Sequence, residues 1–325
     1  MNDKKIKTFL TGIFSDYVVF APSKIDGKLT VKEVKNQENI DWSGQVPENS
    51  WKRVFFPAKE QLFVASGDNL TENKNIYPKT VAMGINVIDL RAFTLYEKVF
   101  ADDLYYQKRR RNTLVVGYSP DWPIDYKKYK IFSHNFEDNV LEHLIFDVFI
   151  VNLKGDNFSF YTGSKDGQRA LEKYGITDYK NIEYAGSTPK TLSDKKMLQL
   201  QMKITKSADK RIWHELGKIC LACGKCSVAC PTCFCFDLED RVDPENPGRI
   251  RKWGNCFYND FSRVAGGYKP LDSVKEKIYF WYVHKFVRIP REYKMPGCVS
   301  CGRCTKVCPV GININKVIAN ISKIN

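Results

Sequence analysis

All eleven cysteines of this 325-residue chain follow position 219, and ten of them fall into two dense segments. The first segment is KICLACGKCSVACPTCFCFD (Lys218–Asp237), and the second is GCVSCGRCTKVCPVGI (Gly297–Ile312). An odd total of cysteines fits a closed disulfide framework poorly. Clustered cysteines in a reducing compartment usually serve metal or redox chemistry, so this part of the chain is expected to fold around a group that binds sulfur.

Each segment contains the same spacing of cysteines, C-x₂-C-x₂-C-x₃-C-P. This run is typical of two-cluster ferredoxins, in which the fourth cysteine binds the other cluster. A tight loop lets three thiolates reach three corners of one cube, and the proline after the fourth cysteine prevents simple helical continuation. We therefore predict two [4Fe–4S] clusters, one bound by Cys220, Cys223, Cys226 and Cys308, and the other by Cys298, Cys301, Cys304 and Cys230.

Two further positions match between the copies. Gly224 and Gly302 occupy the same place, where a small residue lets backbone amides approach the cluster sulfurs. Lys225 and Arg303 follow them, and their charge would favour the reduced, more negative cluster. A single C-x-x-C is also typical of zinc sites and thiol redox pairs. Two complete copies that end in Cys-Pro favour iron–sulfur clusters over a zinc-stabilised scaffold.

Three cysteines lie outside the repeated pattern, namely Cys233, Cys235 and Cys256. They would form a further metal site only with a ligand of another type, such as His284. The alternative is that they are buried thiols close to the clusters, and we favour it because three cysteines do not complete a four-ligand site. No Ser-His-Asp or Cys-His pairing indicates a hydrolase, so we predict no catalytic residue.

The chain is basic, with a formal net charge of +14, and most of the excess lies in its cysteine-bearing part. Residues 201–325 hold 22 Lys and Arg against 11 Asp and Glu, whereas residues 1–200 hold 29 against 26. A basic region can bind nucleic acid, but thiolate-ligated clusters are anionic and offset part of this charge. The remainder suits an acidic partner protein. We interpret QKRRRN (Gln107–Asn112) as a solvated loop or helix end and predict no nucleic-acid binding.

The residues before position 190 predict a mixed α/β domain. Asp16–Val34 has the pattern of a hairpin that turns at Asp26-Gly27, and Phe146–Gly163 has that of a second hairpin. KTVAMGINVIDL and NTLVVGYSP each resemble a short buried strand, and Ser164 and Gly175 bracket a helix. No dinucleotide or phosphate loop motif occurs. Spacing alone therefore predicts no chemistry for the 1–190 domain.

Residues 191–325 have a different pattern. Apolar residues recur at helical intervals in 192–218, before the first cysteine segment, and in 313–325, after the second. This layout predicts a helical ferredoxin-like domain with an insertion at about 236–295, which makes the whole chain α+β. The longest apolar runs are too short to span a membrane, and the start of the chain lacks the features of a secretory signal. We predict a cytoplasmic protein without a membrane span.

The order of several motifs resembles the iron–sulfur β subunit of cytoplasmic NiFe sulfhydrogenases, and also the related A subunit of anaerobic sulfite reductase. These motifs are CPTCFCFD (Cys230–Asp237), GRIRKWGNC (Gly248–Cys256), HKF (His284–Phe286) and the second cysteine segment. A thinner likeness continues upstream through Arg53–Phe63, Gly84–Phe100 and Tyr105–Gly117. Ile88 stands where this family often has a cysteine, so we predict two clusters and not three. By the same departure from the family pattern, the 1–190 domain is expected to be a docking scaffold.

The resemblance implies an electron-transfer subunit without a reaction of its own. It would relay electrons between a flavin subunit that handles NAD(P)H and a NiFe hydrogenase subunit, in a hetero-oligomer. The alternative is the electron-input subunit of an anaerobic sulfite reductase. A redox-sensing module that binds nucleic acid ranks lower, because the chain shows no helix-turn-helix and no basic segment interleaved with aromatic residues.

Overall fold

The computed structural model describes residues 4–73, 77–121, 124, 140–153, 157–187, 195–242 and 247–323. The chain divides into two compact units. The first comprises Met1–Phe55, Ile76–Ser193 and Val299–Cys301, and the second comprises Phe56–Asn75, Asp194–Cys298 and Gly302–Asn325. Both strands and helices are abundant in the described residues, which confirms the predicted α+β class.

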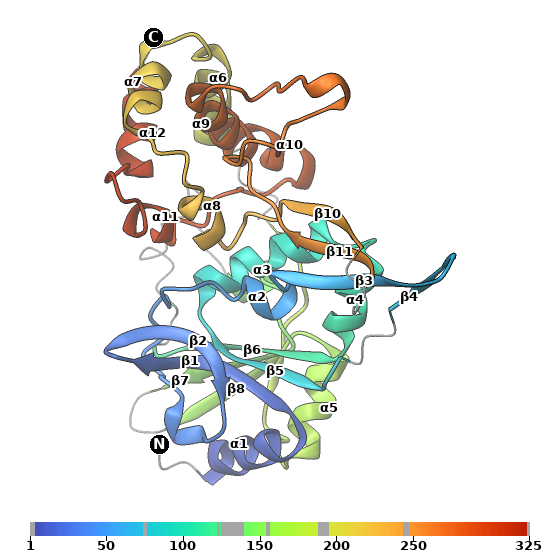
Figure 1. Ribbon diagram of the computed structural model, residues 1–325. Helices are drawn as coiled ribbons and strands as arrows, with labels where there is room; N and C mark the ends of the chain where they lie inside the picture. Colours follow the sequence, from blue (N-terminus) through green and yellow to red (C-terminus); the bar gives the residue numbers. More distant parts are fainter. Residues whose placement is uncertain are drawn as a thin grey trace. The chain divides into compact units, whose positions relative to one another are not determined.

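The first unit is built on a seven-stranded sheet of the described residues, with the order β2-β1-β5-β6-β7-β8-β9 (Figure 1). Strands β1, β5, β6 and β7 run parallel to their neighbours in this series, and hairpins add β2 at one side and β8 at the other. The strand bounds are β1 (Val18–Ile25), β2 (Lys28–Val34), β5 (Thr80–Ile85), β6 (Thr113–Ser119), β7 (Val148–Asn152), β8 (Phe158–Thr162) and β9 (Lys180–Asn181).

Helices cover both faces of this sheet. The helices α1 (Lys4–Asp16) and α5 (Lys165–Lys173) share one hydrophobic core with the strands, and α3 (Val87–Val99) lies on the opposite face, where Leu90 meets Gly117 and Phe149. Because both faces are covered, β5 and β6 are buried along their whole length and have continuous apolar runs. The two predicted hairpins and both predicted strands are therefore confirmed.

Short helical elements complete the described part of the first unit. They are a 3₁₀ turn at Gln37–Asn39, α2 (Lys52–Phe55), α4 (Leu104–Arg111) and a 3₁₀ turn at Val140–His143. The arginine run does lie at the end of α4, but it is not simply solvated as predicted. Arg109 is buried and donates to the Phe55 carbonyl oxygen at 3.1 Å, and Arg110 donates to both carboxylate oxygens of Asp147 at 3.1 and 3.2 Å. These arginines are structural cations.

The second unit contains a four-stranded antiparallel sheet of the described residues, with the order β10-β11-β3-β4. Its strands are β3 (Lys59–Ser66), β4 (Asn69–Glu72), β10 (Phe236–Arg241) and β11 (Gly248–Trp253). Strands from distant parts of the sequence are joined here by a buried ion pair, in which Arg251 Nη2 lies 2.7 Å from Glu60 Oε2. The sheet thus ties residues 59–72 to the segment that follows the first cysteine run.

The rest of the second unit is helical around the buried indole of Trp213, which packs against Tyr279 and Tyr282. The bounds are α6 (Lys195–Lys206), α7 (Arg211–Ile219), α8 (Lys225–Ala229), α9 (Val274–Val283), α10 (Ile289–Tyr293), α11 (Arg303–Lys306) and α12 (Ile314–Ser322), with a 3₁₀ turn at Ala265–Gly267 and a π-helical segment η5 at His284–Arg288. The helices predicted before and after the cysteine segments are confirmed.

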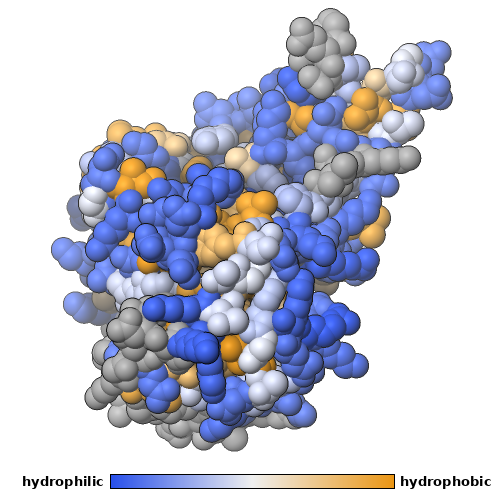
Figure 2. All heavy atoms as spheres, turned by 90° about the horizontal axis from the view of Figure 1, so that it is seen from below, coloured by the Kyte–Doolittle hydropathy of each residue, from blue (hydrophilic) through white to orange (hydrophobic). Residues whose placement is uncertain are grey.

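The face of the chain drawn in Figure 2 carries mainly hydrophilic side chains, with hydrophobic ones in small groups between them. Among the described residues, no helix is both long enough and apolar enough to cross a membrane.

Candidate iron–sulfur site

The two cysteine loops have the same backbone conformation. Ala222 and Gly224 in the first loop have positive φ angles of 49° and 72°, and the equivalent Ser300 and Gly302 have φ angles of 56° and 75°. Each glycine is the N-terminal cap of a short helix, α8 or α11. Turns that alternate between right- and left-handed residues point successive backbone N–H groups inward and form anion-binding concavities. The repeated spacing therefore encodes two copies of one thiolate-binding loop.

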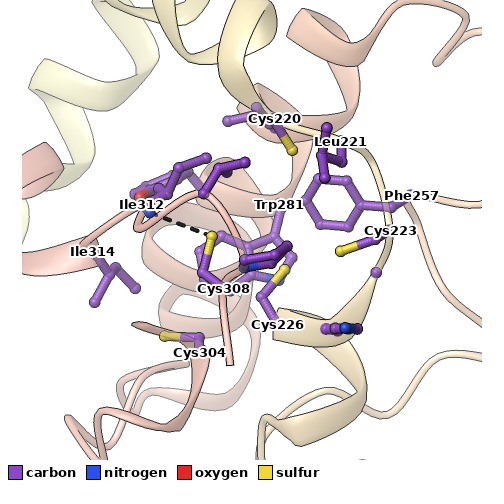
Figure 3. A pocket seen from close by; sticks show the side chains of 16 residues that line it. Cys220, Leu221, Cys223, Cys226, Phe257, Trp281, Cys304, Cys308, Ile312 and Ile314 are labelled. Atoms are coloured by element: carbon purple, nitrogen blue, oxygen red, sulfur yellow. Dashed lines mark hydrogen bonds between the residues drawn. The ribbon is translucent and has the colours of Figure 1, made fainter. Parts of the chain in front are cut away.

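Five cysteines of the two segments line one pocket in the second unit. Cys220, Cys223 and Cys226 come from the first loop, Cys304 comes from α11, and Cys308 comes from the turn after α11. The sulfur atoms of Cys220, Cys223, Cys226 and Cys308 are turned toward a common space in Figure 3, whereas the sulfur atom of Cys304 is turned away from it. The first three cysteines of one copy and the fourth of the other thus meet in one place.

Backbone N–H groups point at the sulfur atoms of this pocket. The amide of Ala222 donates to Cys220 Sγ at 3.4 Å, and the amide of Ile312 donates to Cys308 Sγ at 3.3 Å. Bonds of this kind favour the charged form of the sulfur and tune the potential of a bound cluster. Gly224 allows the loop to pack closely, because a Cβ atom there would lie 2.2 Å from Asn255 Nδ2.

The walls of the pocket are largely apolar and include Phe257, Trp281 and Ile314. Burial raises the pKa of Cys220 and raises that of Cys226 further, since both thiols lose hydration in this environment. Thiols in such a place become thiolates when a positively charged metal binds them. Four sulfur donors around one apolar hollow fit an iron–sulfur cluster. They do not fit a hydrated ion, which needs oxygen donors.

The cysteines predicted to bind the second cluster also affect one another's pKa. Burial and then the nearby charge of Cys230 raise the pKa of Cys304, which places Cys230 beside the second segment. Cys230 itself is buried and is the fourth cysteine of the first repeated pattern. Cys230, Cys298 and Cys304 belong to the second unit, whereas Cys301 is grouped with the first.

The other cysteines lie near the predicted ligands: Cys233 beside Cys230, Cys256 close enough to Cys226 to raise its pKa, and Cys235, which is half-buried, close to Cys256. Cys233 shares a hydrogen bond with Cys230, a contact that raises the pKa of Cys233 and lowers that of Cys230. Cys256 is buried, and its burial raises its pKa to about 12. In the part of the chain that the structure describes, no three His, Cys, Asp or Glu residues lie close enough to hold a single metal ion.

His284 has aromatic neighbours. Its ring stacks on Phe280 with centroids 5.9 Å apart and meets the edge of Phe234 at 5.5 Å. Burial, followed by the charges of Lys285 and Arg288, lowers the pKa of His284 from 6.5 to about 4. These contacts are typical of a packed histidine.

The charged residues at the matching positions of the two loops differ in exposure. Lys225 is exposed at the rim of the pocket, whereas Arg303 is buried. A third charged residue, Lys285, was not predicted. It lies buried beside Cys230 and has no counterpart in the repeated pattern, so spacing gave no signal for it.

Comparison with known proteins gives the same cofactor for this region. Residues 219–312 match the family described as "4Fe-4S dicluster domain". The C-terminal part of this chain carries a 4Fe-4S dicluster domain. The chain is also 26% identical, over 297 residues, to "Sulfhydrogenase 2 subunit beta" of Pyrococcus furiosus, an alignment that covers 83% of this chain and 82% of that protein. No solved structure matches the chain.

These findings confirm the resemblance to iron–sulfur β subunits of sulfhydrogenases on which the sequence prediction rested. The dicluster domain coincides with the cysteine loops and with the pocket that Cys220 and Cys308 share. The number of clusters, the assignment of each ligand and the identity of the partner subunits stay predictions.

Proposed function

We propose that this chain is an electron-transfer subunit that carries two [4Fe–4S] clusters in its dicluster domain. The first cluster is bound by Cys220, Cys223, Cys226 and Cys308, and the second by Cys298, Cys301, Cys304 and Cys230. The observation that carries the proposal is the pocket into which the sulfur atoms of three cysteines of the first segment and of Cys308 are turned, whereas Cys304, which also lines it, turns its sulfur away. It supports an arrangement in which the fourth cysteine of one segment binds the cluster of the other, as the Cys-Pro endings predict.

The clusters, when bound, supply one-electron redox chemistry. Four protein thiolates per cluster leave no iron position open to a substrate, so the residues of this chain have the task of holding the cofactors and not of transforming a molecule. The two sites adjoin, because Cys304 of the second set lines the pocket that holds the first set. Neighbouring clusters of this kind form a short path for electrons.

The first cluster is the one that exchanges electrons with a partner protein. Cys223 is exposed, whereas Cys230 of the second set is buried. Exposed apolar side chains, those of Ile219, Leu221 and Val310, lie next to or in the lining of the same pocket. Apolar contacts around an exposed redox centre let a partner approach closely, and Lys225 at the rim suits an acidic partner.

The complex to which the subunit belongs is a sulfhydrogenase. This part of the proposal rests on the relative whose printed name is a sulfhydrogenase β subunit and on the near-complete coverage of both chains. The partners are then a flavin subunit that handles NAD(P)H and a NiFe hydrogenase subunit, and the complex lies in the cytoplasm.

Anaerobic affinity purification of the chain from its native host tests the function. Metal analysis and mass spectrometry of the co-purified proteins should find nickel, a hydrogenase large subunit and a flavin subunit. Sirohaem without nickel would contradict the sulfhydrogenase and indicate a sulfite reductase. A colourless preparation that contains zinc would contradict electron transfer altogether.

A further inference from the structure

A lysine is completely enclosed beside the cysteines of the proposed second cluster. Lys285 is 2% exposed and lies in η5, the π-helical segment that follows α9. Lysine is almost never fully buried unless it is paired, since an isolated ammonium loses its hydration at a large cost. Single π-helical turns inside α-helices are frequent at functional sites. The position of Lys285 therefore requires partners that offset the cost of burial.

Three acceptors surround the ammonium group of Lys285. Its Nζ lies 3.0 Å from Cys230 Sγ, 3.0 Å from Thr232 Oγ1 and 3.3 Å from the carbonyl oxygen of Gly297. An ammonium has three N–H donors and no acceptor, so these contacts use its whole donor capacity. The Thr232 hydroxyl also donates to the Gly297 carbonyl oxygen at 2.7 Å. The result is a closed hydrogen-bond network with Lys285 at its centre.

The network joins the two cysteine segments. Cys230 is the last cysteine of the first repeated pattern, and Gly297 directly precedes Cys298, the first cysteine of the second. Gly297 also packs closely against η5, because a Cβ atom at position 297 would lie 2.4 Å from the Lys285 carbonyl oxygen. Lys285 thus holds the thiolate that the first segment contributes against the loop that supplies the other ligands.

The electrostatics agree with this geometry. All three N–H donors of the ammonium group have an acceptor at hydrogen-bond distance, one of them the sulfur atom of Cys230, so the surroundings of Lys285 stabilise a cation. On another side the ammonium lies 5.2 Å from the centre of the Trp281 ring, which also favours a cation. Lys285 is a fixed positive charge at the second set of cysteines.

We propose that Lys285 is a positioning residue for the second cluster, which fixes the Cys230 thiolate beside the Cys298 loop and raises the reduction potential of the cluster bound there. The inference rests on the proposed function. One-electron reduction adds one negative charge to a cluster, and a nearby cation that bonds to a sulfur ligand stabilises that added charge. Net charge and hydrogen bonds to sulfur are the established determinants of cluster potential.

The first cluster lacks this arrangement. Among the described residues, the donors to Cys220 and Cys308 are backbone amides, and no lysine or arginine side chain donates to either sulfur. The second cluster should therefore have the higher potential, so that the electron of a singly reduced protein resides at the second cluster.

The test substitution removes the positive charge of Lys285 and keeps a side chain of similar volume. Lys285→Met removes the ammonium, while Thr232 and Gly297 keep the hydrogen bond between them. The matched control is Lys277→Met, because Lys277 is also a buried lysine but lies in α9 and donates to Asn259 Oδ1 at 2.8 Å. The full chain, purified anaerobically with its clusters, is titrated potentiometrically and followed by electron paramagnetic resonance.

We expect Lys285→Met to lower the midpoint potential of one cluster by at least about 59 mV. This shift corresponds to a tenfold change in the one-electron equilibrium constant. Lys277→Met should leave both potentials unchanged. If both clusters are present in Lys285→Met at wild-type potentials, the inference is overturned while the proposed function stands. If the wild-type chain binds no iron, the proposed function fails instead.

If Lys285→Met loses iron, two further substitutions separate the role of the positive charge from that of the hydrogen bond. Lys285→Arg keeps the positive charge, and Lys285→Gln keeps a neutral donor. Retention of the second cluster by Lys285→Arg but not by Lys285→Gln supports a role for the charge in holding Cys230. Equal iron content and equal potentials in the two variants would overturn that role.

Discussion

Gly224 and Gly302 occupy equivalent places in the two cysteine loops, but their surroundings differ. Both have positive φ angles near 75°, where an L side chain is strained. A Cβ atom at Gly224 would meet Asn255, whose amide donates to the Gly224 carbonyl oxygen at 2.8 Å, whereas a Cβ atom at Gly302 would meet nothing within 4 Å. The same substitution thus separates backbone strain from packing.

We expect Gly302→Ala to destabilise the protein by about 1 kcal/mol through backbone strain alone. Gly224→Ala should cost about 2–4 kcal/mol, because Asn255 must also move and lose its bond. Thermal unfolding of the cluster-loaded protein under anaerobic conditions measures both effects. Equal shifts of the unfolding midpoint would show that Asn255 does not restrain the first loop.

His284 gives a prediction on pH. Its pKa is about 4 in the folded protein, against an ordinary value of 6.5 for a solvated histidine. Between these values the unfolded chain binds a proton that the folded chain does not, so stability falls as the pH drops through this window and is unaffected well above it. From pH 7.5 to pH 5 the loss should be about 2 kcal/mol.

The variant His284→Phe should remove this part of the pH dependence, because the ring keeps its contacts but cannot bind a proton. His214→Gln is the control, since His214 is exposed on α7. Urea unfolding of each variant at the two pH values provides the comparison. An unchanged slope in His284→Phe would mean that other groups cause the acid sensitivity.

At the scale of elements, the sequence predicts local features well and distant pairings poorly. The hairpin at Asp26-Gly27 and the helix after Ser164 were predictable, because their signals lie within a few residues. The pairing of β3 with β11 was not, since nothing local records that Glu60 meets Arg251. The burial of Lys285 was unpredictable for the same reason: its acceptors come from two distant segments.

The assignment of ligands also belongs to the scale of elements: the fourth cysteine of each segment is predicted to bind the cluster of the other segment. Cys308→Ala should abolish the same paramagnetic signal as Cys220→Ala, because both residues line the first pocket. Cys230→Ala should abolish the same signal as Cys298→Ala. Each variant should retain about half of the iron. If Cys230→Ala instead reproduces the spectrum of Cys220→Ala, each segment binds its own cluster. The assignment of Cys230 and Cys308 to the cluster of the other segment is then wrong.

At the scale of the whole molecule, the exposed rim of the first pocket should determine the rate of electron exchange with the partner subunit. Leu221 is 64% exposed at that rim, and Leu238, on β10, is 55% exposed but does not line the pocket. We expect Leu221→Asp to slow electron exchange with the co-purified partner at least fivefold, while the cluster content stays unchanged. Leu238→Asp should have no effect. Equal rates in the two variants would place the docking surface elsewhere.

The most direct test of the central claim is the iron and sulfide content of the anaerobically purified chain, combined with electron paramagnetic resonance of the reduced protein. Two clusters predict about eight iron and eight sulfide per chain, and two signals that broaden each other because the sites adjoin. About four iron with a single signal would contradict the second cluster. Zinc in place of iron would contradict the account as a whole.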